Sequence, residues 1–186
     1  MISAQSSDTS VAPPSNRAEH DKQERLNANA EGKPYLAFRL AGEVYAINIL
    51  RIREIIEYNV PTAVPMMPPS VRGVINLRGS VVPVIDLSVR FGNQAAEIGK
   101  RTCFVIVEIE HEGALLVLGL MVDGVNAVLE IDAESVEPAP SFGTPVNTEF
   151  IEGMAKINGR FVIILNIERV LSIEEMAALK TVEATA

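Results

Sequence analysis

The 186-residue chain has one cysteine, two histidines and no tryptophan, and only 5% of its residues are aromatic. A single cysteine, Cys103, excludes an internal disulfide. His20 and His111 are far apart in the sequence and far from Cys103, which excludes a zinc site built from closely spaced cysteines and histidines. The core therefore has to be built mainly from valine, isoleucine, leucine and alanine.

The chain also lacks long apolar runs and a basic surface. No run approaches the roughly 20 residues that a membrane-spanning helix needs, and the amino terminus has no signal-peptide pattern. We therefore expect a cytoplasmic protein with no direct membrane insertion. The formal net charge is −8, whereas a protein that binds nucleic acid needs a basic surface. We expect proteins, and no nucleic acid, as partners.

The clearest motif is Val71–Leu87, which predicts a β-hairpin. Two apolar arms flank Arg78-Gly79-Ser80, where the glycine allows the positive φ of a tight turn. Pro83 has no N–H to donate, so the second arm is expected to lie at a sheet edge or to bulge. Arg78 is the lone cation at the tip of this apolar hairpin.

The same pattern recurs in residues 151–167. The glycines and the polar residue seven positions after the second glycine return at an offset of 80: Gly73, Gly79 and Asp86 against Gly153, Gly159 and Asn166. Residues 118–129 repeat the apolar positions of residues 45–56 at an offset of 73. This order suggests two β-rich halves made by duplication. Chance similarity between valine-rich strands is the alternative.

Short β-branched segments separated by turns, about five per half, predict a mainly all-β fold of two small barrels. Residues 50–58 fit either a helix or a strand, and the β-branched content favours a short turn followed by a strand. Residues 87–92 predict one helical turn. Ser172 and Glu175 have the spacing of a capping box, which predicts a short C-terminal helix to about Lys180.

The composition also predicts where the domain begins and ends. Residues 1–33 contain few large apolar side chains and are expected to form a disordered tail that is dispensable for folding. Residues 34–181 form the domain, with its second half covering roughly 102–170. Residues 182–186 are expected to be flexible.

Catalytic chemistry has little support in the sequence. Asp86 and Asp123 could act as the acid and base of a small hydrolase, but no motif surrounds them. Hydrogen bonds from turn amides are the favoured role for both. Cys103 lies in an apolar segment, where burial raises the pKa of a thiol and makes it inert. We expect no enzymatic activity, no catalytic residues, no metal and no cofactor.

Charged residues gather around the apolar strands of the first half: Arg51, Arg53, Glu54, Arg72 and Arg78. Two interpretations fit them equally well: a solvated face, or an arginine-rich rim that docks a protein.

From about Tyr35 to Leu179 the chain resembles the CheW family of bacterial chemotaxis coupling proteins. The resemblance is carried by four blocks: Arg72–Leu87, Gly119–Val125, Thr148–Gly153 and Asn166–Met176. It implies two intertwined five-stranded SH3-like β-barrels around one apolar core, with short helical turns and a short C-terminal helix.

The resemblance also implies a function and partners. The expected function is a non-catalytic scaffold that couples methyl-accepting chemoreceptors to the chemotaxis histidine kinase in membrane-associated arrays. The expected contacts are the cytoplasmic tip of the receptor and the regulatory domain of the kinase. The alternative is a related coupling protein of another chemosensory system, such as twitching motility or second-messenger control.

The family's contact residues carry over by motif position. The resemblance implies receptor contacts at Glu54, Arg78 and Val128, and kinase contacts at Ile52, Gly73 and Phe142. Phe142 would belong to a second, ring-closing contact. Glu137 stands where some relatives carry a basic residue, so the charge pairing of that contact is left open.

Overall fold

The computed structural model describes residues 32–171, 175 and 177–180. Nearly all of the predicted tail and the whole predicted C-terminal stretch 182–186 lie outside these residues. The first strand begins at Lys33, the last residue of the predicted tail.

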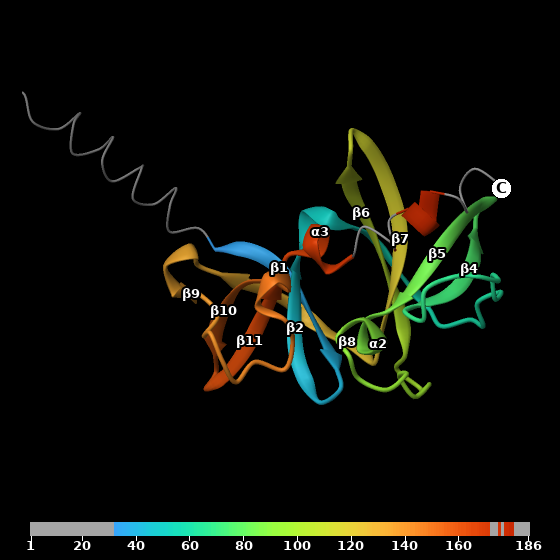
Figure 1. Cartoon of the computed structure of the whole chain (residues 1–186). Coiled ribbons are helices and arrows are strands. Elements are labelled where there is room, and N and C mark those ends of the chain that lie inside the picture. Colours follow the sequence, from blue (N-terminus) through green and yellow to red (C-terminus); the bar gives the residue numbers. More distant parts are fainter. Residues whose placement is uncertain (1–31, 172–174, 176, 181–186) are drawn as a thin grey trace, which may run out of the picture. The chain divides into compact units, whose positions relative to one another are not determined.

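Within the described residues, eleven strands form two mixed sheets (Figure 1). The first sheet has the order β8 (Gly124–Ile131), β1 (Lys33–Leu40), β2 (Glu43–Asn48), β11 (Arg160–Leu165), β10 (Ile151–Ile157) and β9 (Val136–Glu137). The second has the order β3 (Ile52–Glu57), β6 (Cys103–His111), β7 (Ala114–Val122), β5 (Ser80–Asp86) and β4 (Val71–Leu77). The predicted mainly β fold is confirmed.

Five short helical turns connect the strands. They are η1 (Ile49–Arg51), α2 (Leu87–Arg90), η2 (Ala133–Ser135), η3 (Thr148–Phe150) and α3 (Ile167–Val170). The predicted turn-then-strand at residues 50–58 and the predicted helical turn after residue 86 are confirmed by η1, β3 and α2. Glu175 and residues 177–180 are helical, in agreement with the predicted C-terminal helix.

Each sheet contains strands from both halves of the chain, which is what intertwines them. β1 and β2 of the first half pair with strands of the second half, and β6 and β7 of the second half pair with strands of the first. The two sheets share one order: β3, β6, β7, β5 and β4 correspond in turn to β8, β1, β2, β11 and β10. We call this correspondence the pseudo-symmetry of the domain.

The two predicted hairpins have the same register at the offset of 80. Val71 opposes Ile85 and Gly73 opposes Val84 in β4–β5; Ile151 opposes Leu165 and Gly153 opposes Ile164 in β10–β11. Both pairings carry a bulge at the same place. The parallel pairings agree as well, since Val84 opposes Gly119 and Ile164 opposes Ala46. Chance similarity between strands does not reproduce such a register.

The edges of the five-stranded sheet are joined by the segment that follows β3. Thr62 and Val74 exchange both backbone hydrogen bonds, each 2.8 Å long. In the other sheet the two-residue strand β9 pairs with β10 in the equivalent place. Five strands were predicted for each barrel. The six-stranded sheet has one more because its closing segment forms the short strand β9.

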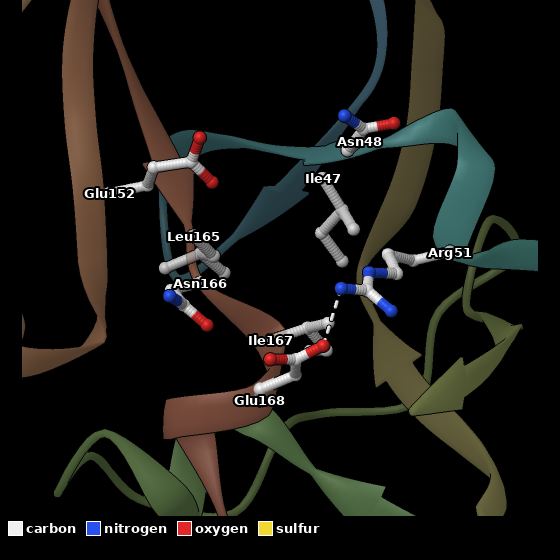
Figure 2. Close-up of a pocket in the computed structure, with 8 residues that line it drawn as sticks. All are labelled: Ile47, Asn48, Arg51, Glu152, Leu165, Asn166, Ile167 and Glu168. Atoms are coloured by element: carbon white, nitrogen blue, oxygen red, sulfur yellow. Dashed lines mark ion pairs between the residues drawn. The ribbon is translucent and has the colours of Figure 1, made fainter. Parts of the chain in front are cut away.

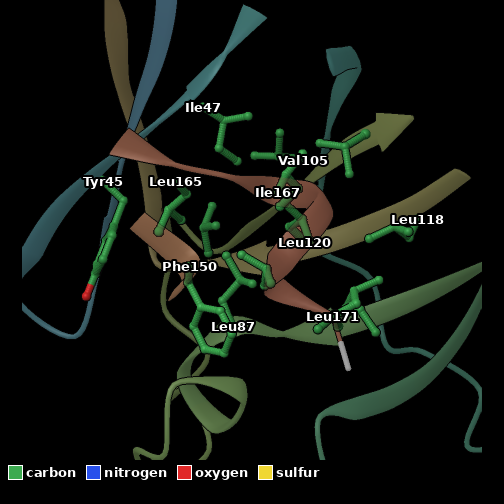
Figure 3. Packing of buried hydrophobic residues seen from close by; sticks show 14 of the residues in the cluster. Tyr45, Ile47, Leu87, Val105, Leu118, Leu120, Phe150, Leu165, Ile167 and Leu171 are labelled. Atoms are coloured by element: carbon green, nitrogen blue, oxygen red, sulfur yellow. The ribbon is translucent and has the colours of Figure 1, made fainter. Parts of the chain in front are cut away.

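Alternation along the strands divides the apolar side chains among three clusters. Odd-numbered residues of β6, such as Val105 and Val107, enter one large central cluster, while Phe104 and Ile106 enter a smaller cluster of the five-stranded sheet. In the other sheet Ala46 belongs to a third cluster. Figure 3 shows the central cluster, to which strands of both sheets and the short helices contribute. Period-two alternation thus gives each sheet its own interior and lets both share one core.

The structure corrects one local prediction, that of Pro83, and another, the capping box, falls partly outside the described residues. Pro83 does not lie on an edge strand, because β5 is flanked by β7 and β4. Its missing N–H is tolerated because pairing of β5 with β7 begins only at Val84. In the predicted capping box, Ser172 lies outside the described residues. Glu175 is buried and contacts Ser70 and Arg90, which ties the C-terminal helix to the first half of the domain.

Candidate docking surface

An ion pair connects the two edges of the five-stranded sheet. Nη1 and Nη2 of Arg78 donate to Oε1 and Oε2 of Glu54, each at 2.7 Å. Glu54 lies on β3, and Arg78 lies in the turn between β4 and β5. The Arg78 side chain is 75% exposed and that of Glu54 is 25% exposed. Two of the three residues that the family resemblance assigns to the receptor are therefore held together at the surface.

The backbone at Arg78 has a conformation that arginine rarely adopts. Arg78 has a φ of 52° and Gly79 a φ of 87°, so both turn residues are left-handed. The repeat has the same turn, with Asn158 at 51° and Gly159 at 79°. Asparagine tolerates this region better than arginine does. Because the repeat has asparagine at the equivalent position, the duplicated fold does not require a cation at this turn.

The ion pair lies beside a hollow of about 370 Å³. We call it the Arg78 hollow; its lining residues are Arg53, Glu54, Leu77, Arg78, Ser80, Val81, Val82 and Val117. Sequence reasoning missed Val117, which β7 brings to this place from the other half of the chain. Only the crossed pairing of β5 with β7 puts it there, and no local pattern indicates that pairing.

The pair is charged at neutral pH. The hydrogen bond from Arg78 lowers the pKa of Glu54, and desolvation opposes this only in part. The same hydrogen bond raises the pKa of Arg78. The arrangement offers a partner one guanidinium with exposed N–H groups next to apolar valine and leucine side chains.

The structure gives Gly73 a structural role. Its φ is +139°, and a Cβ added there would lie 2.2 Å from the carbonyl oxygen of Thr62. Thr62 is the residue that joins the two edges of the sheet. A side chain at this buried position would displace the closing segment, so Gly73→Asp is expected to disturb the fold. Ile52, at the start of β3, is half-buried and packs against the central cluster.

The remaining two candidate residues are exposed but lie elsewhere. Val128 is 52% exposed and belongs to β8, an edge of the six-stranded sheet. Phe142 is 82% exposed in the proline-rich loop after β9. Neither residue lines the Arg78 hollow. The structure thus brings Glu54 and Arg78 together and places Val128 and Phe142 apart from them in the fold.

The other arginines of the first-half cluster are individually paired. Arg51 pairs with Glu168 at a second hollow of about 210 Å³ (Figure 2). Nε of Arg53 lies 3.2 Å from Oε2 of Glu108, and Nε of Arg72 lies 3.9 Å from Oδ2 of Asp86. These contacts fit the solvated-face interpretation. The Arg78 pair differs from them in that both of its residues line the Arg78 hollow and that it joins β3 to the β4–β5 turn.

The candidate catalytic residues are engaged in structural contacts. Oδ1 of Asp86 accepts hydrogen bonds from the amides of Ser88 and Val89 at 2.9 and 3.3 Å, and Oδ2 accepts one from Ala96 at 3.1 Å. Oδ2 of Asp123 accepts one from the amide of Ala41 at 2.9 Å. Both aspartates therefore accept turn amides, as the sequence favoured.

Cys103 is half-buried, and desolvation raises the pKa of its thiol. Among the described residues, no group of three or more histidine, cysteine, aspartate or glutamate side chains is placed to hold a metal ion. None of the helices in the described part of the chain is long and apolar enough to cross a membrane.

Comparison with known proteins agrees with these features. Residues 34–175 match the family model of the CheW-like domain. The chemotaxis protein CheW of Klebsiella aerogenes is 37% identical over 85% of this chain and 93% of that protein. CheW of Rhizobium meliloti is 33% identical over 79% of this chain and 92% of that protein.

A solved structure is similar as well. The scaffolding protein TtCheW of Thermoanaerobacter tengcongensis superposes with a TM-score of 0.70 at 36% sequence identity, over 77% of this chain and 90% of that one. The family model covers most of the chain, and the fold, the repeat and the hairpin motifs agree with it. The chain belongs to the CheW-like domain family.

Proposed function

We propose that the chain is a non-catalytic scaffold of chemotaxis, which couples chemoreceptors to the chemotaxis histidine kinase. Membership of the CheW-like family supports this function, and the relatives named above are chemotaxis and scaffolding proteins. Asp86 and Asp123, the acid and base of the hydrolase alternative, accept hydrogen bonds from turn amides, which favours the adaptor over that alternative. An adaptor of this kind needs separate surfaces for its partners, and the domain presents several.

The receptor surface is the Glu54–Arg78 pair with the Arg78 hollow. The carrying observation is that arginine occupies a left-handed turn position where the repeat has asparagine. An exposed guanidinium next to apolar side chains is typical of interface hot spots, in which arginine is enriched. Glu54 holds the guanidinium in a fixed direction, which reduces the side-chain entropy that binding costs. Val128 on β8 extends the receptor contact to the other sheet.

The kinase surfaces lie elsewhere on the domain. Ile52 contributes the exposed part of its side chain at the start of edge strand β3, and Gly73, on the opposite edge strand β4, keeps the closing segment in place. Phe142, exposed in the second proline-rich loop, provides an anchor for a separate contact with the regulatory domain of the kinase. With two kinase contacts and one receptor contact, the chain is recruited to receptor arrays at the membrane without entering it.

Co-sedimentation with membranes that contain chemoreceptor tests the proposal. Kinase is mixed with the membranes in the presence and absence of this chain, and both pelleted kinase and kinase activity are measured. The expected result is that the chain increases both. Equal pelleting and equal activity with and without the chain would contradict the adaptor function.

A further inference from the structure

A third hollow, of about 270 Å³, lies where the β1–β2 hairpin meets the start of β8. Arg39 on β1 and Arg101, which precedes β6, both line it. Neither arginine forms an ion pair with any residue that the structure describes. Two unpaired guanidinium groups at one hollow are notable in a chain with a net charge of −8. We call this place the Arg39–Arg101 hollow.

The pseudo-symmetry shows what is missing from this hollow. In the five-stranded sheet, Val107 opposes Ile52 and Ile106 opposes Glu54, which leaves Arg53 as the bulged residue. In the six-stranded sheet, Phe38 opposes Val125 and Ala37 opposes Ala127, which leaves Asn126 as the bulged residue. Glu108 follows Val107 as Arg39 follows Phe38. Arg39 and Asn126 therefore occupy the positions of Glu108 and Arg53.

In the five-stranded sheet these two positions form an ion pair at 3.2 Å. In the six-stranded sheet the acid is replaced by Arg39 and the base by a neutral amide, so the carboxylate is lost, one cation remains, and the net charge of the two positions rises from zero to one positive charge. Asn126 also lines the Arg39–Arg101 hollow. Its amide and the two guanidinium groups supply hydrogen-bond donors, and arginine can bind a carboxylate in a bidentate manner.

The local structure leaves room for a ligand and keeps the hollow's own acid engaged. A Cβ at Gly124 would lie 3.2 Å from Cβ of Arg101, so glycine is what lets the Arg101 stem pack against the strand. Asp123 is the acidic residue among those that line the hollow. Its Oδ2 accepts the amide of Ala41 in the β1–β2 turn, which satisfies part of its charge.

We propose that the Arg39–Arg101 hollow binds paired carboxylates of an acidic protein segment. Exposed single ion pairs are worth little, so one free carboxylate is a poor ligand. Two adjacent acidic side chains can engage Arg39 and Arg101 together. The negative field of the whole chain opposes an acidic ligand, so the contact is local and weakens as salt is added. The same field makes a second copy of this chain an unfavourable occupant.

The test uses the full chain and a short peptide, capped at both ends, with two adjacent glutamates. Binding is followed by NMR through the Nε–Hε signals of the arginines. We expect saturable shifts of the Arg39 and Arg101 signals that weaken with added NaCl. The same peptide with two glutamines should cause none. Equal shifts with glutamine would overturn the proposal, because the ligand charge would then be irrelevant.

The variant pair Arg39→Ala and Arg101→Ala should bind the glutamate peptide about tenfold more weakly, as expected for the loss of two charge-assisted contacts. Arg160→Ala with Arg169→Ala is the matched control, since these exposed arginines also lack an ion partner in the described structure but lie outside the hollow. The control should bind as the parent does. Equal affinity of the two double variants would contradict the proposal.

Inorganic phosphate is the last arm of the test. Shifts of both arginines by phosphate, without any by the glutamate peptide, would assign the hollow to phosphate and overturn the carboxylate proposal. The experiment needs neither receptor nor kinase, so its outcome is independent of the adaptor function.

Discussion

The hairpins β4–β5 and β10–β11 are two copies of one structure with different surfaces. They share register, bulge and a left-handed turn, as the equivalent φ values of Arg78 and Asn158 show. Arg78 forms an ion pair with Glu54, whereas the pseudo-symmetric positions hold Asn158 and Ala127. Features found in both copies are those the fold needs, and a feature found in one copy is free to serve a partner.

The same comparison separates Gly73 from Arg78. Gly73 and Gly153 both allow a close approach: a Cβ would meet Thr62 at 2.2 Å in one hairpin and Val136 at 2.3 Å in the other. A glycine present in both copies is a requirement of the closing segment. Loss of kinase binding in a Gly73 variant would therefore report damage to the sheet edge, and a direct contact could not be concluded from it.

The largest expected effect is on stability at these glycines. Gly73→Ala should lower the free energy of unfolding by about 3 kcal/mol or more, because the clash is with backbone and φ is positive. Gly153→Ala should cost about 1–2 kcal/mol, because its nearest contact is the end of a side chain that can shift. Urea denaturation of both variants checks the difference. Equal losses of unfolding free energy in the two variants would contradict this, because they would mean that both closing segments shift equally easily to make room for a Cβ.

A smaller difference in stability is expected between alanine variants of the polar residues that end the two hairpins, Asp86 and Asn166. Asp86→Ala leaves two amides of the α2 turn and the amide of Ala96 without this acceptor at a buried position, which should cost about 2–3 kcal/mol. Asn166 makes no side-chain hydrogen bond to α3, so Asn166→Ala should cost less than about 1 kcal/mol. Thermal or urea unfolding measures both. A larger loss at Asn166 would contradict this interpretation of the two turns.

Arg78→Asn should have almost no effect on stability. It removes an exposed ion pair worth about 0–1 kcal/mol, and it relieves a left-handed arginine by placing the repeat's residue in the turn. We expect a change within about 0.5 kcal/mol. A loss well above 1 kcal/mol in urea denaturation would show that the Glu54–Arg78 pair holds the sheet edges together and is structural.

The smallest effect concerns pH. Because the folded pKa of Glu54 is lowered from its ordinary value of 4.5, any stability from the pair is present above pH 4.5 and is lost as the pH falls through the lowered pKa. No change is expected between pH 6 and 8. NMR titration of the Glu54 carboxyl should show its pKa rising in Arg78→Asn and unchanged in Asn158→Ala. An unchanged Glu54 pKa in Arg78→Asn would contradict the pair in solution.

The sequence predicted the features that depend on local pattern. The glycine-bearing hairpins, the offsets of 80 and 73, and the helical turn after Asp86 follow from spacing and residue type, and all are found. The exposed tip position of Arg78 followed in the same way. The family resemblance implied receptor contacts at both Glu54 and Arg78. The structure pairs these two residues, and their role in receptor docking stays a prediction.

Non-local pairing could not be predicted. The exchange of strands between halves brings Val117 to the Arg78 hollow, and no residue near Val117 indicates it. The contact of Gly73 with Thr62 depends on a loop whose prolines indicate only that it is irregular. The edge position predicted for the strand of Pro83 was wrong for a related reason. A strand can be internal to a sheet and still lack a partner along part of its length. The sequence shows the pseudo-symmetry as a repeat. It does not show which sheet each strand joins, because packing of the whole domain decides that.

The central claim is that receptor docking belongs to one hairpin through Arg78. The most direct measurement is co-sedimentation of Arg78→Asn with receptor membranes, beside Asn158→Ala as the matched change in the other hairpin. Arg78→Asn should lose about 2 kcal/mol of receptor binding, roughly thirtyfold in affinity, as expected for an interface hot spot. Asn158→Ala should bind as the parent does, and both variants should keep normal kinase affinity. Equal receptor binding by Arg78→Asn and the parent would contradict the account.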